Sequence, residues 1–438
     1  MNNRMTFRIW LIAFFVIATV NLRAQDGTKK LSLQEAINIG IQNSKNLKIS
    51  KAKIDEATAL LQQANDSRLP DFNINGSYLR LNSANIKLVS DSSRGGAGIK
   101  INQALYGTAT LSLPLYAGGR IKYGIESARF LKQASVLDAE NDKEAVIFNT
   151  IKAFINLYKS YEAVLLVKEN LQSSVSRDRN FSNLEKNGLL ARNDFLKSQL
   201  QTSNIELSLL DAQTNNKLAM VNMNLMLGLP ENTLLLLDTG FMTSKQYLKN
   251  FEEYENQALE RRKDLQALNF RKKAAVTAIR SANAEAYPVI GLTGGYVAAY
   301  VPDFITVTNA LNVGIGVKYN LANLYKKNSN LMQANARQTE LNANEEILND
   351  AIKSQVNQDY QNYLLNQKKM EVYESAFEQA KENYRITKNK YDNSLVTITD
   401  LLEADVALLQ SKLNISFAKA DAVLAYNKLL QTSGTLSQ

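Results

Sequence analysis

Residues 113–129 read LPLYAGGRIKYGIESAR. An alternation of apolar and polar residues ends in Gly118-Gly119, and a charged, helix-forming stretch follows without a polar loop. Residues 319–337, YNLANLYKKNSNLMQANAR, show the same change later in the chain, with Leu324-Tyr325 in place of the glycine pair. Glycine lets the backbone change direction where a side chain would obstruct it. The two stretches therefore predict strands that pass directly into helices.

Both junctions lie inside an internal repeat. Residues 63–78, QANDSRLPDFNINGSY, align with residues 281–296, SANAEAYPVIGLTGGY, at an offset of 218. Residues 186–198 align with residues 392–404 at an offset of 206. The difference of 12 predicts an insertion in the first copy between Tyr78 and Leu115, in an exposed outer loop that includes Ser92. Each copy is expected to hold a helix, two strands, a long helix and a further helix.

The alternating segments have one apolar and one polar face. In the first copy Phe72 and Ile74 alternate with Asn73 and Asn75, and in the second copy alternate residues from 311 to 321 are apolar. A period of two residues with two unlike faces is typical of a strand between two media. A soluble sheet with one face on a core is the alternative. This alternative requires a layer that covers the apolar face. The neighbouring helices would have to supply that layer, but their apolar stripes are expected to pack against other helices.

The helical stretches are long. Residues 120–186 contain no proline and would form a helix of roughly 100 Å. An apolar-rich stripe from Leu402 to Leu430 steps by four and three residues, which is typical of coiled-coil packing. The helices that precede the strands are expected at about 33–67 and 251–286.

The N-terminal residues predict export. Arg4 and Arg8 precede an apolar run from Ile9 to Val20, which is too short to span a bilayer, and a small residue, Ala24, precedes a plausible cleavage point. We expect five segments: a signal peptide at 1–24, a first repeat at 25–230 with a β-hairpin at about 71–117, a linker at 231–250, and a second repeat at 251–438 with a β-hairpin at about 288–321.

The composition narrows the class of function. The 438 residues include no cysteine and no histidine, which removes disulfides, a lipid anchor, the commonest metal ligand and the commonest general base. No cofactor and no metal site is expected. Lysine and arginine are mixed with acidic residues along the helices, so the net charge of +9 does not indicate a nucleic acid partner.

Four strands per chain leave two open edges, and lipid cannot satisfy the N–H and C=O groups of an open edge. The chain must therefore associate with copies of itself to close a barrel. Three chains would give 12 strands, an even number within the known range.

These features resemble a known family, the TolC-like outer membrane efflux proteins. The resemblance rests on the order, spacing and duplication of LSLQEAI with NSKNLKI near the start, LPLYAGGRIKYGIESA after the second strand, and NGLLARNDFLKSQ and NSLVTITDLLEAD at the helix turns. It implies an α+β membrane protein: a homotrimer whose outer-membrane barrel of 12 strands continues as a periplasmic coiled-coil tunnel. It also implies a passive exit duct, linked by a periplasmic adaptor protein to an inner-membrane pump of the RND, ABC or MFS type.

The resemblance also implies roles for residues near the helix turns. Asp400 and Glu403 match positions that form acidic rings, and Tyr391 matches a tyrosine that ties helices together, here to Asp194. The turns themselves would contact the adaptor through Gly188, Leu189, Leu190, Ser394, Leu395 and Val396. Helix capping is the alternative role for Asp194 and for Asp400, since Asp400 and Glu403 have the D-x-x-E spacing of a capping box.

Two other functions remain open at this point. A periplasmic coiled-coil scaffold without a pore would explain the helices but has no need of the two-faced hairpins. An enzyme that uses carboxylates alone is the third hypothesis, and no pocket-like cluster of acids in the sequence supports it.

Overall fold

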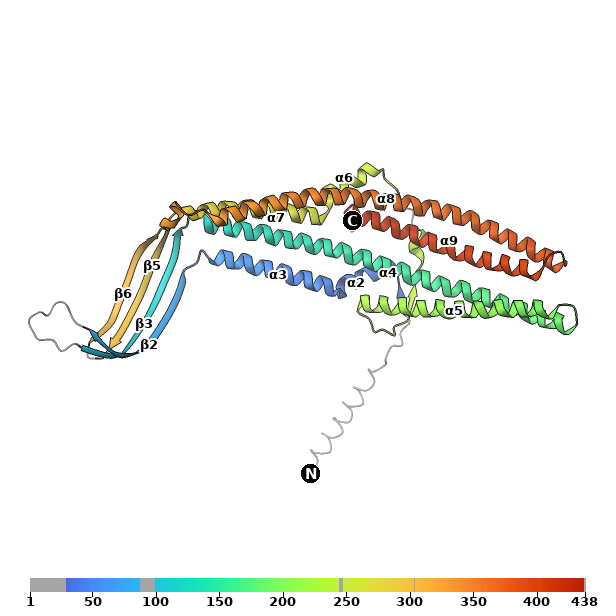
Figure 1. Cartoon of the computed structure of the whole chain (residues 1–438), viewed down its shortest axis with the longest axis horizontal. Helices are drawn as coiled ribbons and strands as arrows, with labels where there is room; N and C mark the ends of the chain where they lie inside the picture. The colour runs from blue at the N-terminus through green and yellow to red at the C-terminus, as the bar shows by residue number, and fades with distance from the viewer. Residues whose placement is uncertain (1–28, 87–98, 244–246, 303, 437–438) are drawn as a thin grey trace, which may run out of the picture. The chain divides into compact units, whose positions relative to one another are not determined.

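The computed structural model of the chain describes residues 29–86, 99–243, 247–302 and 304–436 (Figure 1). The expected signal peptide and the expected loop around Ser92 lie outside the described residues. The chain forms two compact units, and each contains parts of both repeats. We call their described parts the strand unit (48–86, 99–142, 261–302 and 304–352) and the helical unit (29–47, 143–243, 247–260 and 353–436).

The strand unit is built on one antiparallel sheet. Its strands are β2 (Asp71–Ile86), β3 (Ile99–Tyr116), β5 (Val289–Val301) and β6 (Ile305–Lys318), in the order β2-β3-β5-β6 (Figure 1). Each repeat supplies one hairpin, and β3 pairs with β5 to join the two. The outer edges of β2 and β6 carry no further strand among the described residues.

The register aligns the faces of the two repeats. One row across the sheet consists of Phe72, Leu111, Gly294 and Val313, and the next consists of Asn73, Thr110, Gly295 and Asn312. Residues opposite one another lie on the same face, so the apolar sides of both hairpins form one surface.

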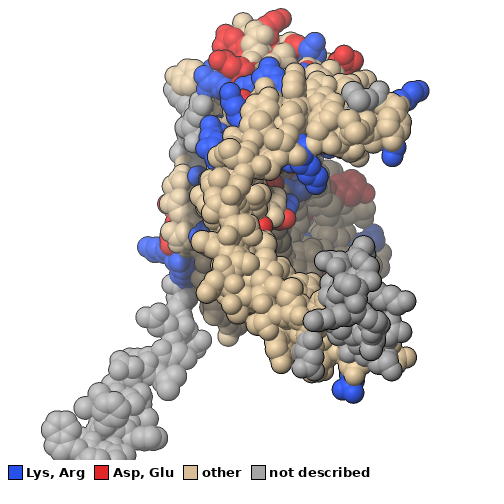
Figure 2. Space-filling model, turned by 90° about the vertical axis from the view of Figure 1, so that its left-hand side faces the viewer, with Lys and Arg blue, Asp and Glu red and all other residues tan. Residues whose placement is uncertain are grey.

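Within the described residues, no layer covers the apolar surface along β6. Leu311, Val313, Ile315 and Val317 are 67–76% exposed. The four strands hold only four charged residues, Asp71, Arg80, Lys100 and Lys318, and the surface over the strands in Figure 2 is mostly uncharged. A soluble sheet with its apolar face on a core therefore does not describe this unit.

The helices of the strand unit are α3 (Lys45–Asp66), α7 (Lys263–Asn283) and the first parts of α4 (Arg120–Lys186) and α8 (Ser329–Asp392). Leu268 and Ala275 of α7 pack against Leu341 of α8. Basic residues of α7 pair with acids on both neighbours: Lys263 with Glu140 at 2.9 Å, Arg271 with Asp138 and Lys272 with Glu345. No helix in the described part of the chain is both long enough and apolar enough to cross a membrane.

The two strand-to-helix junctions differ. Gly118 and Gly119 both have positive φ, 62° and 87°, and α4 begins at the next residue. In the second repeat β6 ends at Lys318, so the prediction that the strand continues to Leu321 was wrong. A short 3-10 helix (η3, Leu321–Leu324) follows, because Asn320 accepts a hydrogen bond from the backbone N–H of Ala322 and turns the chain.

The helical unit begins with a parallel strand pair that the sequence analysis missed, β1 (Lys29–Leu31) with β4 (Leu235–Leu237). Three residues are too few for an alternation to be recognised. The pair covers a core formed by α2 (Leu33–Asn43), α4 and α5 (Arg192–Leu227), which includes Phe154, Met223 and Leu227. A second core lies between α2, α4 and α9 (Ile398–Thr432), around Ile151 and Ile155.

The helices that precede the strands occupy the predicted ranges, 33–67 and 251–286, but each is interrupted once. One break falls at Ser44, between α2 and α3, and the other at Arg262, between α6 (Phe251–Arg261) and α7. The two positions are equivalent at the offset of 218. The side chain of Ser44 accepts from the backbone N–H of Leu47 and starts the second helix. Apolar periodicity continues across such a break and does not reveal it.

We predict that Gly118→Ala destabilises the junction. An added Cβ would lie 2.7 Å from the carbonyl oxygen of Ala284 and 2.8 Å from Cβ of Tyr287, at a φ of +62°. The left-handed conformation alone costs about 1–2 kcal/mol with a side chain. Gly124→Ala is the matched control, because it lies within α4 and a Cβ there meets nothing within 4 Å. It should stabilise the helix by about 1 kcal/mol. Thermal unfolding of the purified proteins measures both, and equal melting temperatures would contradict this account.

Candidate functional site at the helix turns

The two turns of the helical unit share one backbone geometry. Gly188 follows the end of α4 in the α4–α5 turn and has a φ of 70°, and Ser394 takes a φ of 62° at the equivalent position between α8 and α9. The N–H of Gly188 donates to the carbonyl of Glu185, and that of Ser394 donates to the equivalent Tyr391, each at 2.9 Å. A serine thus adopts the left-handed conformation that glycine adopts in the first repeat, and the second turn is as tight as the first.

The apolar residues of the turns are exposed in pairs. Leu189 is 74% exposed and its equivalent Leu395 is 72% exposed. The next residues, Leu190 and Val396, are half-buried, and Leu190 packs against the aromatic cluster described below. Each turn therefore presents one large apolar side chain to its surroundings.

Asp400 lies in the first turn of α9. Thr397 is the N-cap residue and accepts from the backbone N–H of Asp400, while Asp400 accepts from the backbone N–H of Thr397 at 2.8 Å. The capping box is thus Thr397 with Asp400, and the expected pair of Asp400 with Glu403 was wrong because the helix begins two residues before Asp400. The hydrogen bonds from Thr397 lower the pKa of Asp400. Its ionised form therefore stabilises the fold above the unfolded pKa, and this contribution is lost as pH falls through the folded pKa.

Asp194 lies near the start of α5, and here too the aspartate is not the cap. The N-cap residue is Ala191, which has no side-chain hydrogen bond to the helix. Asp194 is half-buried and pairs with Lys197 at 3.4 Å. The ammonium of Lys197 also donates to the hydroxyl of Thr399 on α9 at 3.3 Å, so it connects the two turns.

Tyr391 belongs to an aromatic and apolar cluster below the turns. The cluster contains Phe181, Phe195, Ile398 and Leu401, and the rings of Phe181 and Tyr391 have centroids 5.7 Å apart. Burial raises the pKa of Tyr391, and the charges of Asp194 and then Asp392 raise it further. Asp194 is thus close enough to act on Tyr391 electrostatically, although the two share no hydrogen bond in the described structure. Glu403 lies apart from them, exposed on α9.

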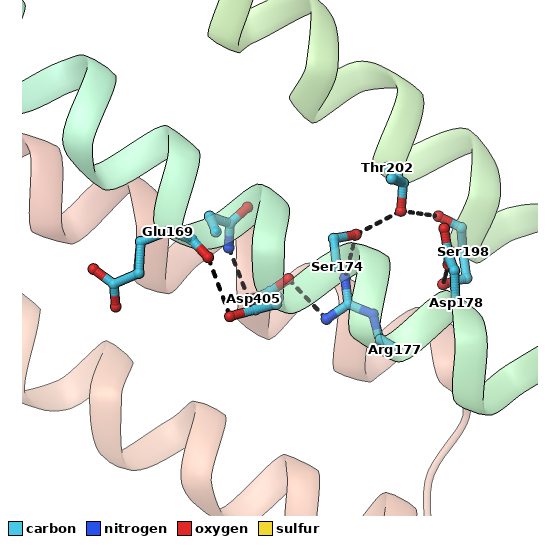
Figure 3. Close-up of polar contacts among 9 residues, drawn as sticks. Glu169, Ser174, Arg177, Asp178, Ser198, Thr202 and Asp405 are labelled. Carbon is cyan, nitrogen blue, oxygen red and sulfur yellow. Dashed lines mark hydrogen bonds and ion pairs between the residues drawn. The ribbon is translucent and has the colours of Figure 1, made fainter.

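A buried ion pair, Arg177 of α4 with Asp405 of α9, lies further along the same helices (Figure 3). Their side chains are 10% and 6% exposed, and guanidinium and carboxylate are 2.9 Å apart. Asn170 donates to the other carboxylate oxygen at 3.2 Å, and Arg177 also donates to Ser174 at 3.1 Å. Removing one partner of such a pair would leave a buried charge without compensation.

The interface between α4 and α5 carries further buried polar contacts, also drawn in Figure 3. The hydroxyls of Ser174 and Thr202 are 2.6 Å apart, and Ser198 donates to the carboxylate of Asp178. We call these four residues the polar seam. In the second repeat their equivalents are Ala380, Leu408, Ala404 and Tyr384. The first helical hairpin thus has a polar interior where the second has a largely apolar one.

The sequence analysis missed the ion pair and the polar seam. A position-by-position comparison of the two repeats could have indicated the polar seam, since its serine and threonine residues align with alanine and leucine in the second repeat at an offset of 206. No such signal exists for the ion pair. Arg177 and Asp405 are equivalent to Asn383 and Gln199, so neither position identifies the other as its partner.

A cavity of about 520 Å³ borders the ion pair. It is lined from α4, α8 and α9, by residues that include Arg177, Tyr384, Lys388 and Tyr391. The Nε–H of Arg177 is buried without an acceptor among the described residues. Burial raises the pKa of Tyr384, and the charge of Asp405 adds to this. In the part of the chain that the structure describes, no cluster of acidic residues is arranged to hold a metal ion.

Solved structures identify the fold as that of TolC-like outer-membrane channels. The chain is similar to the outer membrane protein VceC of Vibrio cholerae, with a TM-score of 0.75 and 17% identity over 92% of this chain and 96% of that one. It is also similar to the CmeC outer membrane channel of Campylobacter jejuni, with a TM-score of 0.75 and 18% identity over 92% and 86%. The MtrE outer membrane channel of Neisseria gonorrhoeae, in its open state, gives a TM-score of 0.72 and 18% identity over 92% and 89%. No curated protein matches the sequence closely enough to count as a relative.

The family comparison agrees. Residues 36–229 and 255–435 match the family described as outer membrane efflux protein, and the chain belongs to this family. The predictions of family, of fold and of a channel that is not an enzyme are confirmed. The chain is therefore an exit duct of the outer membrane.

We predict that the ion pair stabilises the helical unit only as a pair. Arg177→Met or Asp405→Leu alone leaves an uncompensated buried charge and should cost about 3–5 kcal/mol. The double variant removes both charges and should recover most of that loss. Lys368→Met is the control, because its pair with Glu371 is exposed and should contribute little. Denaturant unfolding of the purified proteins measures these effects. A double variant as unstable as the sum of the single variants would contradict the coupling.

Proposed function

We propose that three copies of this chain form a passive duct, with a closed barrel of 12 strands in the outer membrane. A periplasmic adaptor would connect the duct to an inner-membrane pump. The uncovered apolar face of the sheet is the observation that carries the proposal. A periplasmic scaffold would leave that face in water.

The height of the apolar face fits the membrane. Ile290 and Tyr300 are ten residues apart on one face of β5, and a strand advances about 3.4 Å per residue, so they span about 34 Å. Strands in outer-membrane barrels tilt by roughly 40°, which reduces this to about 26 Å along the membrane normal. The apolar band of such barrels is about 25 Å tall.

The open edges support closure by copies of the chain. All neighbouring strands of the sheet are antiparallel, so the two edge strands, β2 and β6, run in opposite directions. The edge strand β6 of one copy can therefore pair in an antiparallel manner with β2 of the next copy. Closure satisfies every edge group, which lipid cannot do. A single copy has no other way to satisfy both edges among its described residues.

Helix α5 also carries an unpartnered apolar stripe. Six leucines on one side of this helix are 48–65% exposed: Leu196, Leu200, Leu207, Leu210, Leu218 and Leu225. Leu365, Val372 and Ile386 form a similar exposed stripe with a spacing of seven or fourteen residues on α8. Stripes of this length suit helix packing between neighbouring copies, in which each covers the other.

The turns are proposed as the adaptor contact and the gate. Leu189 and Leu395, flanked by Gly188, Leu190, Ser394 and Val396, would contact the adaptor through their exposed side chains. Asp400 and Glu403 would form an acidic ring at the narrow mouth, with Asp194 and Tyr391 positioning the helices around it. Like charges close to one axis attract cations and oppose closure. Helix capping by Asp400 is compatible with this role.

We expect Ile315→Arg to impair assembly, because this residue would face lipid. An arginine near the midplane of a barrel costs about 2–4 kcal/mol. Asn312→Arg, on the opposite face of the same strand, should be tolerated because it would face the aqueous interior. Recovery of heat-resistant trimers from outer membranes measures both. Equal yields for the two variants would contradict the assignment of the faces.

The double variant Asp400→Asn with Glu403→Gln tests the proposed gate. It removes the acidic charge with little change in shape, and the amide oxygen of asparagine at position 400 can still accept the hydrogen bond from the backbone N–H of Thr397. We expect weaker cation selectivity and weaker block by multivalent cations in planar-bilayer recordings. Glu374→Gln, on the exposed surface of α8, serves as the charge control. Unchanged selectivity and block in the double variant would contradict the acidic ring and leave Asp400 with helix capping alone.

A further inference from the structure

One arginine interrupts the apolar face of the sheet. The register of β2 with β3 is regular from Asp71 to Arg80, so Arg80 lies on the same face as Phe72, Ile74 and Tyr78. It follows the apolar rows at the end of the sheet away from α3, whose last residue, Asp66, precedes the start of β2. Arg80 is exposed, and it forms no hydrogen bond or ion pair with the described residues.

The residue opposite Arg80 adds a second donor. Gln103 of β3 is its register partner, and the hydroxyl of Tyr78 donates to the amide oxygen of Gln103 at 3.1 Å. This hydrogen bond orients the amide and leaves its NH₂ group without an acceptor in the described structure. Arg80 and Gln103 are thus cross-strand neighbours on one face.

No acid on the sheet neutralises this pair. The only acidic residue of the four strands is Asp71, nine positions away along β2 and on the opposite face. The next row toward the helices is Tyr78, Leu105 and Tyr300, and further apolar rows follow. Among the described residues, Arg80 is thus a cation without an ion-pair partner, next to a second donor and to the apolar rows of the same face.

We propose that Arg80 and Gln103 bind the phosphate-bearing headgroup of an outer-leaflet lipid. The inference rests on the proposed barrel, in which this face meets lipid and the end away from the helices is the outer end. The planar guanidinium can donate two parallel hydrogen bonds to a phosphate, and the amide supplies a third donor. The acyl chains then lie along the apolar rows. Simple hydration of Arg80 is the competing account.

The experiment measures binding of lipid A, a phosphorylated glycolipid, to the purified full-length trimer in phosphatidylcholine nanodiscs. Arg80→Gln should weaken binding about tenfold or more, the effect of losing hydrogen bonds to a charged group. Arg80→Lys keeps the charge but not the planar fork and should lie between the two. Lys318→Gln is the matched control: it removes one exposed strand-end charge on the opposite face, at the end near the helices, and should change nothing.

The outcomes separate this inference from the barrel. The proposed lipid site is supported if Arg80→Gln assembles into normal trimers that bind lipid A more weakly than the wild type. Equal binding of lipid A by the wild type and Arg80→Gln overturns it while the barrel stands. Inorganic phosphate that competes as strongly as lipid A also overturns it, because the lipid chains would then contribute nothing. Failure of the wild type to form a membrane-inserted trimer would instead overturn the proposed function.

Discussion

The rest of the structure depends on one constraint: the four-stranded sheet has backbone groups at its two edges and an apolar face that the described chain leaves without partners. Two free strand edges and an uncovered apolar face cannot both be stable in water. Lipid accepts the face but not the edges, and only closure with further strands satisfies the edges. The junctions from strand to long helix differ between the repeats. In the first repeat α4 begins shortly after β3, whereas in the second a short 3-10 helix lies between β6 and α8.

Duplication gave the chain two similar halves, and the helical unit uses them differently. The turns at Gly188 and Ser394 are the same in backbone, down to equivalent hydrogen bonds. The hairpins behind them differ, because the polar seam of the first has largely apolar equivalents in the second. Buried polar groups are costly when unpaired, so a seam of paired hydroxyls and a carboxylate favours one register. The ion pair between Arg177 and Asp405 then joins α4 to α9, one helix from each half.

Much of the fold followed from periodicity. Alternation over many residues predicted the four long strands, and the absence of proline from 120 to 186 predicted the length of α4. Short or local features were missed: the β1–β4 pair, the breaks at Ser44 and Arg262, and the early end of β6. The break at Ser44 and the end of β6 each involve one side-chain hydrogen bond, and the β1–β4 pair depends on a partner far away in the chain. The capping of α9 was assigned to the wrong pair for a related reason, since two overlapping spacings both fit the motif.

The sequence by itself determined the repeat, the two-faced strands, the long helices and the likeness to outer-membrane efflux proteins, because these depend on residue order and spacing along the chain. It also placed the turn residues, since equivalent positions of the two copies mark both turns. Only the tertiary structure decided that β3 pairs with β5, that Asp405 meets Arg177, and that Arg80 lies opposite Gln103. These relations join residues by register and distance in space, and no local pattern in the chain encodes the distance between positions 177 and 405.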